Sequence, residues 1–180
     1  MTAIYLSPSV QEYSPFIIGG SEEYYMNRIA DAMIPYLRAS GIGFYRNSPG
    51  STLSEIVAKS NSGDCDLHLA LHASSSPDNL RGVFQGPDVY HYTLSTEGQR
   101  AAHIIAANLR KIYPDPSLVT TIPATTLAEL RRTNAPAILV QIAYQDNYTD
   151  AAWIRDNIDE IARNLVESAA QYLGVPFVSP

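Results

Sequence analysis

The stretch Cys65–Ser75, CDLHLALHASS, decides the fold predicted for this chain. Three leucines alternate in it with His68, Ala70 and His72. This period of two predicts a β-strand that carries the leucines on one face and both histidines on the other. The alternative is a helix, on which histidines four residues apart form a zinc pair. The strict alternation and the serines that follow favour the strand, on which His68 and His72 lie about 13 Å apart and cannot both bind one metal ion.

The position of each histidine along the predicted strand suggests a different role. Ligands of α/β proteins bind in the crevice beyond the carboxyl ends of the strands. His72 lies at that end and is the candidate functional residue, whereas His68 is expected to be buried or interfacial. A single histidine at a strand end is more often structural than catalytic, so His72 needs partners before it indicates a site.

Composition sets the class of protein. The chain has 180 residues and a mass of 19.7 kDa, with 46% hydrophobic and 17% charged residues, which predicts one domain over residues 1–180 with a full core. A net charge of −6 and the lack of any Lys/Arg cluster disfavour nucleic acid and membrane surfaces as partners. No apolar run is long enough to span a membrane. The only cysteine, Cys65, excludes an internal disulfide and a cysteine-based zinc site.

Predicted strands and helices alternate along the whole chain. Strands are expected at residues 3–6, 43–46, 89–94 and 137–143, in addition to the histidine strand. Helices are expected from Glu22 to a stop at Gly41, with a kink at Pro35, and at residues 52–59, 96–112, 125–132 and 150–173. Thr96 and Gln99 are expected to form a capping box. This order predicts a single α/β domain with a twisted, mostly parallel sheet and helices on both faces.

One strand should lie at the centre of that sheet. The run 137–143, AILVQIA, is apolar almost throughout, as expected for a strand that is buried on both faces. The helix at 150–173 should pack against it. The ends of this strand, of the first strand and of the histidine strand should then converge on one crevice.

Glu22, at the start of the first helix, can reach the same crevice. Catalytic zinc commonly takes histidine and glutamate ligands and keeps one coordination position open, so Glu22 and His72 are candidate metal ligands. The simpler interpretation, that Glu22 only stabilises the start of its helix, is favoured without further context. The sequence contains no G-x-S-x-G elbow, no Walker loop and no dinucleotide fingerprint.

A series of blocks resembles the zinc-dependent N-acetylmuramoyl-L-alanine amidases of the amidase-3 family. In order, the blocks are IYLSPS, SEEYYMNRIAD, DLHLALHAS, RG followed by VYHY, STEGQRAA and LAELRRTNAPAILVQIAYQDN, with a terminal helix after them. The resemblance extends over about residues 3–174. It implies a twisted sheet with flanking helices, and hydrolysis of the amide that joins muramic acid to the peptide stem of peptidoglycan.

The resemblance assigns roles to only some residues of this chain. The family's metal-binding glutamate matches Glu22, and its strand-end metal histidine matches His72. The family's first metal histidine belongs in the loop after the first strand, where this chain has Ser9-Val10-Gln11. Its catalytic glutamate belongs at Gln141. Two of the four expected residues are therefore absent.

These two absences predict a weakened site. Zinc held by one glutamate and one histidine should be bound weakly or not at all, although Glu12 is a candidate substitute ligand. Gln141 can form hydrogen bonds but cannot act as a general acid or base. It is either a satisfied buried amide or a retained substrate contact; a deliberate change of glutamate to glutamine is a third interpretation, and it leaves the missing histidine unexplained. Gln11 and Ser74 are the candidate substrate-binding residues.

Two functions from different classes remain open. The first is an amidase-type peptidoglycan hydrolase with a weakened or altered zinc site. The second is a pseudoenzyme that binds cell-wall fragments or a protein partner in the same crevice. No signal peptide is visible, so we expect a protein that is cytoplasmic as synthesised and reaches the wall only if it is released or exported by another route. The sequence does not indicate an oligomeric state.

Overall fold

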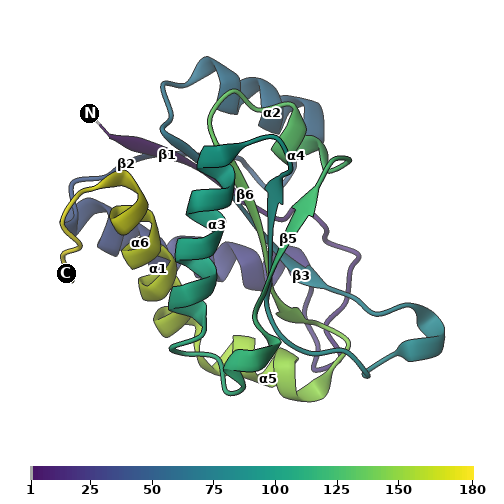
Figure 1. Cartoon of the computed structure of the whole chain (residues 1–180). Coiled ribbons are helices and arrows are strands. Elements are labelled where there is room, and N and C mark those ends of the chain that lie inside the picture. Colours follow the sequence, from purple (N-terminus) through teal and green to yellow (C-terminus); the bar gives the residue numbers. More distant parts are fainter. Residues whose placement is uncertain (1) are drawn as a thin grey trace.

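Six strands form one twisted sheet in the computed structural model, which describes residues 2–180 (Figure 1). Their order across the sheet is β2-β1-β3-β6-β4-β5. The strands are β1 (Ala3–Pro8), β2 (Gly43–Arg46), β3 (Leu67–Ser74), β4 (Asp88–Tyr92), β5 (Thr120–Ala124) and β6 (Ala137–Tyr144). β2, β1, β3 and β6 are parallel, while β4 pairs antiparallel with β6 and parallel with β5. The sheet is mostly parallel and β6 is central, which confirms both predictions.

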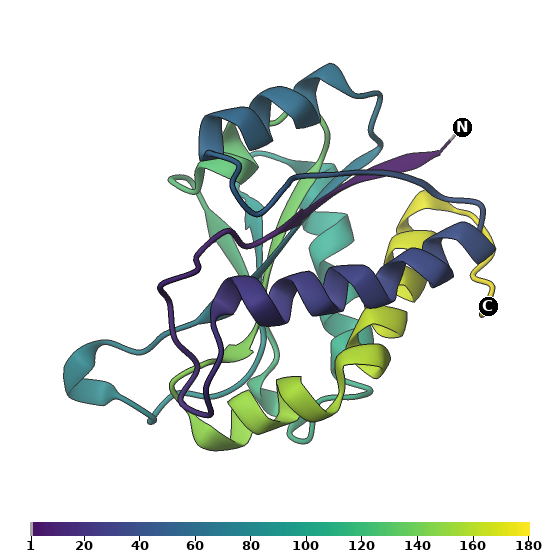
Figure 2. The same ribbon diagram turned by 180° about the vertical axis from the view of Figure 1, so that it is seen from behind.

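The helices form two unequal layers. α1, α3 and α6 pack together on one face of the sheet, while α2 and α4 cover part of the other face (Figure 2). The helices are α1 (Glu22–Ala39), α2 (Leu53–Ser62), α3 (Thr96–Leu109), α4 (Ala128–Arg131), α5 (Tyr148–Asp156) and α6 (Ile158–Leu173), with short 3-10 turns η1 (Asp78–Leu80) and η2 (Pro116–Leu118). α1 and α6 each bury one apolar face, so the larger helical layer holds most of the core. None of these helices is long and apolar enough to cross a membrane.

Three details differ from the sequence prediction. The helix expected over residues 150–173 is two helices, α5 and α6, because the backbone leaves the helical region at Asn157 (φ −126°, ψ 28°). β5 was not predicted. Ser95, not Thr96, caps α3, and its side chain accepts a hydrogen bond from the backbone of Gly98. As predicted, the first helix runs through Pro35 and ends just before Gly41.

The connection between β3 and β4, residues 75–87, projects from the body of the molecule (Figures 1 and 2). We call this segment the arm. Its base is held by carboxylates that follow β6: Asp146 accepts from the backbone N–H groups of Ser76 (3.0 Å) and Gly82 (2.8 Å), and Asp150 accepts from that of Gly86 (2.9 Å). These bonds fix where the arm leaves the sheet.

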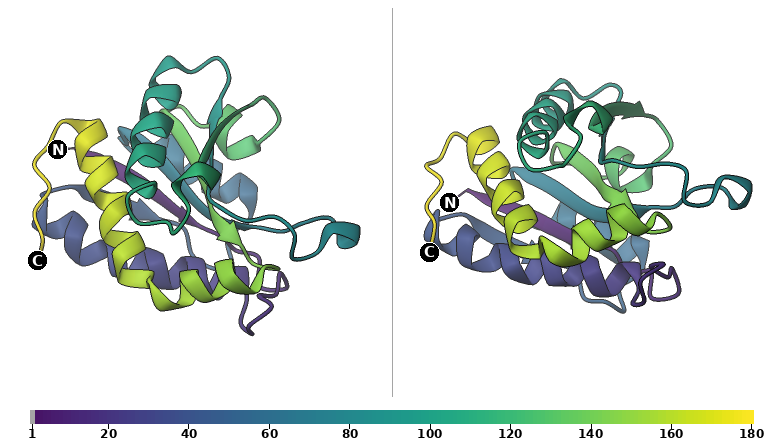
Figure 3. Two further views of the ribbon diagram at one scale, coloured as in Figure 1. Left: turned by 60° about the horizontal axis from the view of Figure 1, so that its bottom comes forward. Right: turned by 90° about the horizontal axis from the view of Figure 1, so that it is seen from below.

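The carboxyl ends of three neighbouring strands determine where a ligand can approach. β1, β3 and β6 are neighbouring parallel strands, so their carboxyl ends lie at the same edge of the sheet (Figure 3). At this edge the loop after β1, the arm and the start of α1 come together. The crevice predicted from the sequence lies here.

Candidate active site

His68 and His72 lie on the sheet face that α2 and α4 partly cover. Period two along β3 puts both rings on this face, as predicted, with Ala70 between them. Strand register places Ser7 beside Ala70 and Gln141 beside His72. The polar groups of β1, β3 and β6 are therefore brought to one surface by backbone pairing alone.

Glu22 contacts His72 directly. Its Oε1 lies 2.9 Å from His72 Nδ1 and also accepts a hydrogen bond from the backbone N–H of Ala73 at 3.2 Å. The cap of α1 is Ser21, whose hydroxyl accepts from the backbone of Tyr24. Glu22 is only 3% exposed, so its side chain points into the site and does more than stabilise the start of the helix.

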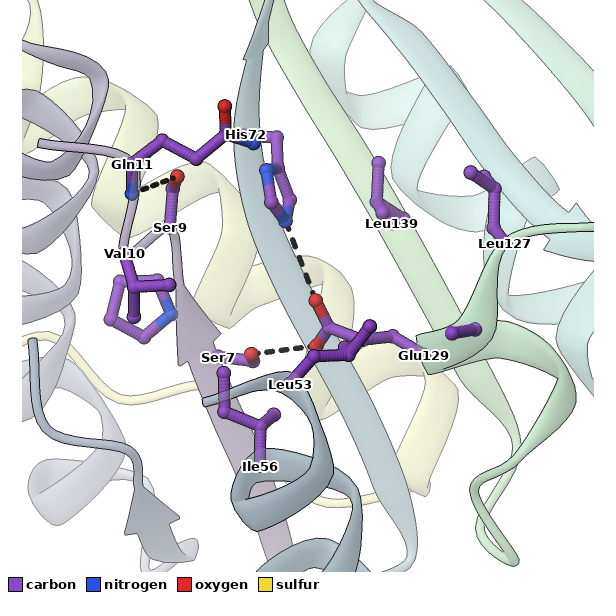
Figure 4. A pocket seen from close by; sticks show the side chains of 12 residues that line it. Ser7, Ser9, Val10, Gln11, Leu53, Ile56, His72, Leu127, Glu129 and Leu139 are labelled. Carbon is purple, nitrogen blue, oxygen red and sulfur yellow. Dashed lines mark hydrogen bonds and ion pairs between the residues drawn. The ribbon is translucent and has the colours of Figure 1, made fainter. Parts of the chain in front are cut away.

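The other nitrogen of His72 faces a second glutamate, Glu129 of α4, which the sequence analysis did not single out. Glu129 Oε1 lies 3.4 Å from His72 Nε2. Its Oε2 accepts a hydrogen bond from the Ser7 hydroxyl at 2.7 Å (Figure 4). The same oxygen lies 2.7 Å from His68 Nε2. Both histidines of β3 therefore reach the same carboxylate, and His72 lies between two glutamates.

His68 is fully buried behind this carboxylate. Its Nδ1 lies 2.9 Å from the hydroxyl of Ser60 in α2, and its ring stacks on Tyr5 with centroids 5.2 Å apart and planes inclined by 6°. A continuous chain of contacts thus runs Ser60–His68–Glu129–His72–Glu22. The buried position of His68 agrees with the prediction.

The charged groups in this series of contacts shift each other's pKa values. Burial by itself would lower the pKa of His72, but hydrogen bonds and charge from Glu129 and Glu22 outweigh it and raise that pKa to about 9. Burial would raise the pKa of Glu129, but the hydrogen bonds and charges of the two histidines hold it well below its usual range. At neutral pH these shifts favour a charged His72 ring beside an ionised Glu129.

A cavity of about 250 Å³ opens next to His72 (Figure 4). One part of its wall is polar and includes Ser7, Ser9, His72 and Glu129. The remainder is largely apolar and comes from the loop after β1, from α2, from the segment around α4 and from β6: Pro8, Val10, Leu53, Ile56, Leu127, Ala128 and Leu139. Gln11, a predicted substrate-binding residue, also lines this cavity.

Gln141 and Ser74 are bound to each other beside His72. The Ser74 hydroxyl donates to Gln141 Oε1, so the amide oxygen has a partner within the protein. Asp88 of β4 lies next to Gln141 in the strand register, and burial raises the pKa of its carboxyl. A carboxylate that the sequence analysis missed is therefore the cross-strand neighbour of Gln141.

Sequence and structure comparisons identify the family. The model of the N-acetylmuramoyl-L-alanine amidase family, amidase-3, matches residues 15–171, which is most of the chain. The chain belongs to this family. No curated protein matches it.

Solved structures of amidases share the fold of this chain. The amidase AmiC2 of Nostoc punctiforme superimposes with a TM-score of 0.85 at 18% identity, covering 96% of this chain and 97% of that one. The catalytic domain of CwlV from Bacillus (Paenibacillus) polymyxa gives 0.84 at 15% identity, with 98% and 100% covered. An amidase of Clostridium difficile 630 gives 0.83 at 14% identity, with 96% and 97% covered. The single-domain α/β architecture is thus that of the amidase-3 fold.

The residues of this amidase-3 chain supply only part of a zinc site. Members of the family usually depend on zinc, and Glu22 Oε1 and His72 Nδ1, the two predicted donors, face each other at 2.9 Å. Throughout residues 2–180, however, no three His, Cys, Asp or Glu side chains are grouped so that they could hold a metal ion. Glu12, the candidate substitute, is exposed and lines a neighbouring hollow together with Tyr13. Glu22 and His72 are therefore the donors of this chain that would hold a metal ion.

Proposed function

We propose that this chain is a cell-wall domain of the amidase class, which binds the muramoyl-peptide linkage of peptidoglycan in the crevice at His72 and has a weakened metal site. The observation that carries the proposal is the pair Glu22–His72, placed side by side at the carboxyl end of β3 in a chain that belongs to the amidase family. Peptidoglycan lies outside the cytoplasmic membrane, so the domain must be released or exported in order to reach it.

The polar groups around the crevice suit a muropeptide. Gln11 and Ser9 can hydrogen-bond the sugar or the peptide backbone, while the apolar wall of the cavity can accept a small side chain of the stem. A metal ion, when bound, would be held by Glu22 and His72 and would polarise the scissile carbonyl. His72 and Glu22 would also orient the linkage from the end of β3.

A specific observation favours the second candidate, a binding module without turnover. The amide of Gln141 is paired with Ser74 and has no ionisable form, so it cannot take a proton from water or give one to the leaving amine. The same crevice would then bind wall fragments without cleaving them. We therefore expect binding in both cases and little turnover.

Metal and muropeptide titrations test the proposal. Calorimetry with zinc should give only weak binding, in the high micromolar range or above, since two donors come from the protein. Submicromolar zinc affinity that disappears in His72→Ala would contradict the weakened site and would make Glu12 the suspected third ligand. Muropeptide binding that is lost in Gln11→Ala and kept in Tyr24→Ala, on the exposed side of α1, would support the location of the crevice.

A further inference from the structure

Glu129 is the one carboxylate that joins the two histidines of β3. It is 7% exposed, and both of its oxygens are engaged: Oε2 with Ser7 and His68 at 2.7 Å each, and Oε1 with His72 at 3.4 Å. A buried carboxylate is unfavourable unless it is paired in this way. Its partners come from two different strands, so they hold it in one place.

The contacts behind Glu129 keep it from moving. His68 is fixed by the Ser60 hydroxyl on one side and by the stacked ring of Tyr5, and it has no exposed surface. α4 is a single turn, Ala128–Arg131, so without these partners the side chain of Glu129 would have little to hold it. These buried contacts therefore fix the position of the Oε1 atom of Glu129, which faces the cavity.

Oε1 of Glu129 faces Nε2 of His72, the ring nitrogen on the side away from Glu22. A carboxylate that accepts the Nε2 proton fixes the orientation of the ring and leaves Nδ1 directed at Glu22. Histidines that bind a metal or a substrate are commonly oriented by such a partner, whose loss typically costs about 10- to 100-fold in metal affinity.

We infer that Glu129 is a positioning residue for His72: held by Ser7 and His68, it fixes the Nε2 side of the ring so that Nδ1 stays directed at Glu22, the pair that would hold a metal ion as a ligand. The inference rests on the proposed function only in naming that ligand. The rival account is that Glu129 is present solely to satisfy buried His68, in which case its contact with His72 would have no consequence for the ring.

Nuclear magnetic resonance of the imidazole nitrogens separates these accounts. The chain has four histidines, and the signals of His72 are assigned by their absence in His72→Gln. In the unmodified protein, the Nε2 proton of His72 should be visible and slow to exchange with water. In Glu129→Leu it should exchange at least tenfold faster and its nitrogen signal should move, because the acceptor is gone.

A matched control removes the outermost contact of this series, which involves neither Glu129 nor His72. Ser60→Ala deletes the hydroxyl that contacts His68 and lowers stability. Because His68 and Ser7 still hold Glu129, the Nε2 proton of His72 should exchange much less than tenfold faster than in the unmodified protein. If Glu129→Leu does not fold, Glu129→Gln, which keeps the shape of the side chain and removes its charge, should produce the same change to a smaller degree.

An unchanged Nε2 signal of His72 in the folded variant would overturn the inference and leave Glu129 as a partner of His68 alone. The same result with a changed His68 signal would support the rival directly. Since this measurement needs neither metal nor wall fragments, it is independent of the proposed function. A protein that shows the predicted signals but binds no muropeptide would refute the proposed function only.

Discussion

At the scale of the residue, the site depends on ionised groups that satisfy each other inside the protein. His68, with no exposed surface, and Glu129 form the most buried pair in it, at 2.7 Å. Removing one member of such a pair leaves a charge or a polar group without its partner, which costs more than the pair contributes when both are present. The stability of the site should therefore show strong coupling between these two positions.

We predict that His68→Leu lowers the free energy of unfolding by about 3–5 kcal/mol, because it leaves Glu129 buried with fewer partners. The double variant His68→Leu with Glu129→Leu should be more stable than His68→Leu alone by about 1 kcal/mol or more. Urea denaturation followed by circular dichroism measures both values. Additive losses in the double variant would show that the pair is not coupled.

The low turnover that we propose would also arise from single residues. Gln141→Glu restores a carboxylate beside His72, yet the metal would still lack its third ligand, so the gain in stem-peptide release should be modest. Combining Gln141→Glu with Val10→His should raise release by more than the product of the two single effects, since neither part works without the other. Release of stem peptide from isolated walls is the measurement, and simple multiplication of the two effects would count against this account.

At the scale of the element, the sequence predicted the regular segments well and the short ones poorly. The period-two pattern of β3 and the apolar run of β6 determined their type and their position in the sheet. β5 was missed because its sequence, TTIPA, carries a proline and lies at the edge of the sheet, where burial imposes no clear alternation. The break at Asn157 was missed because the apolar spacing continues across it.

The same limit explains why Glu129 was missed. α4 has four residues, too few for a periodic pattern, and the partner His68 is 61 residues away in the sequence. One indirect signal was present: two histidines on one face of a strand require an acceptor in the core. That signal predicts a partner without saying which residue provides it.

The arm offers a test of how tightly an element is held. Gly86 has φ +100°, and a Cβ there would lie 2.5 Å from the backbone oxygen of Leu118. Gly86→Ala should therefore cost about 3 kcal/mol of stability from backbone strain and crowding together. Gly41→Ala is the control, because φ is +68° with no heavy atom within 4 Å, and it should cost about 1–2 kcal/mol from strain alone. If urea denaturation showed equal losses of stability in the two variants, the base of the arm would have to shift and relieve the crowding at residue 86.

At the scale of the whole molecule, the fold and the chemistry depend on different sets of residues. Amidase structures with 14–18% identity superimpose over nearly the whole chain, since a parallel sheet with a helical layer tolerates many side chains. The resemblance seen in the sequence therefore predicted the architecture and the family. The chemistry depends on a few side chains at the ends of β1, β3 and β6, and their roles follow from the contacts of those residues, not from the fold.

The most direct test of the weakened site is hydrolysis of peptidoglycan by the unmodified chain, with and without a metal chelator. Isolated cell walls are incubated with the protein, and released stem peptide is quantified by mass spectrometry beside a wall-binding assay on the same sample. We predict that the protein binds walls and releases little or no stem peptide, because Gln141 cannot transfer a proton and the metal is poorly held. Robust release that the chelator abolishes would contradict this account, and Asp88, the cross-strand neighbour of Gln141, would then be the first residue to test as the base.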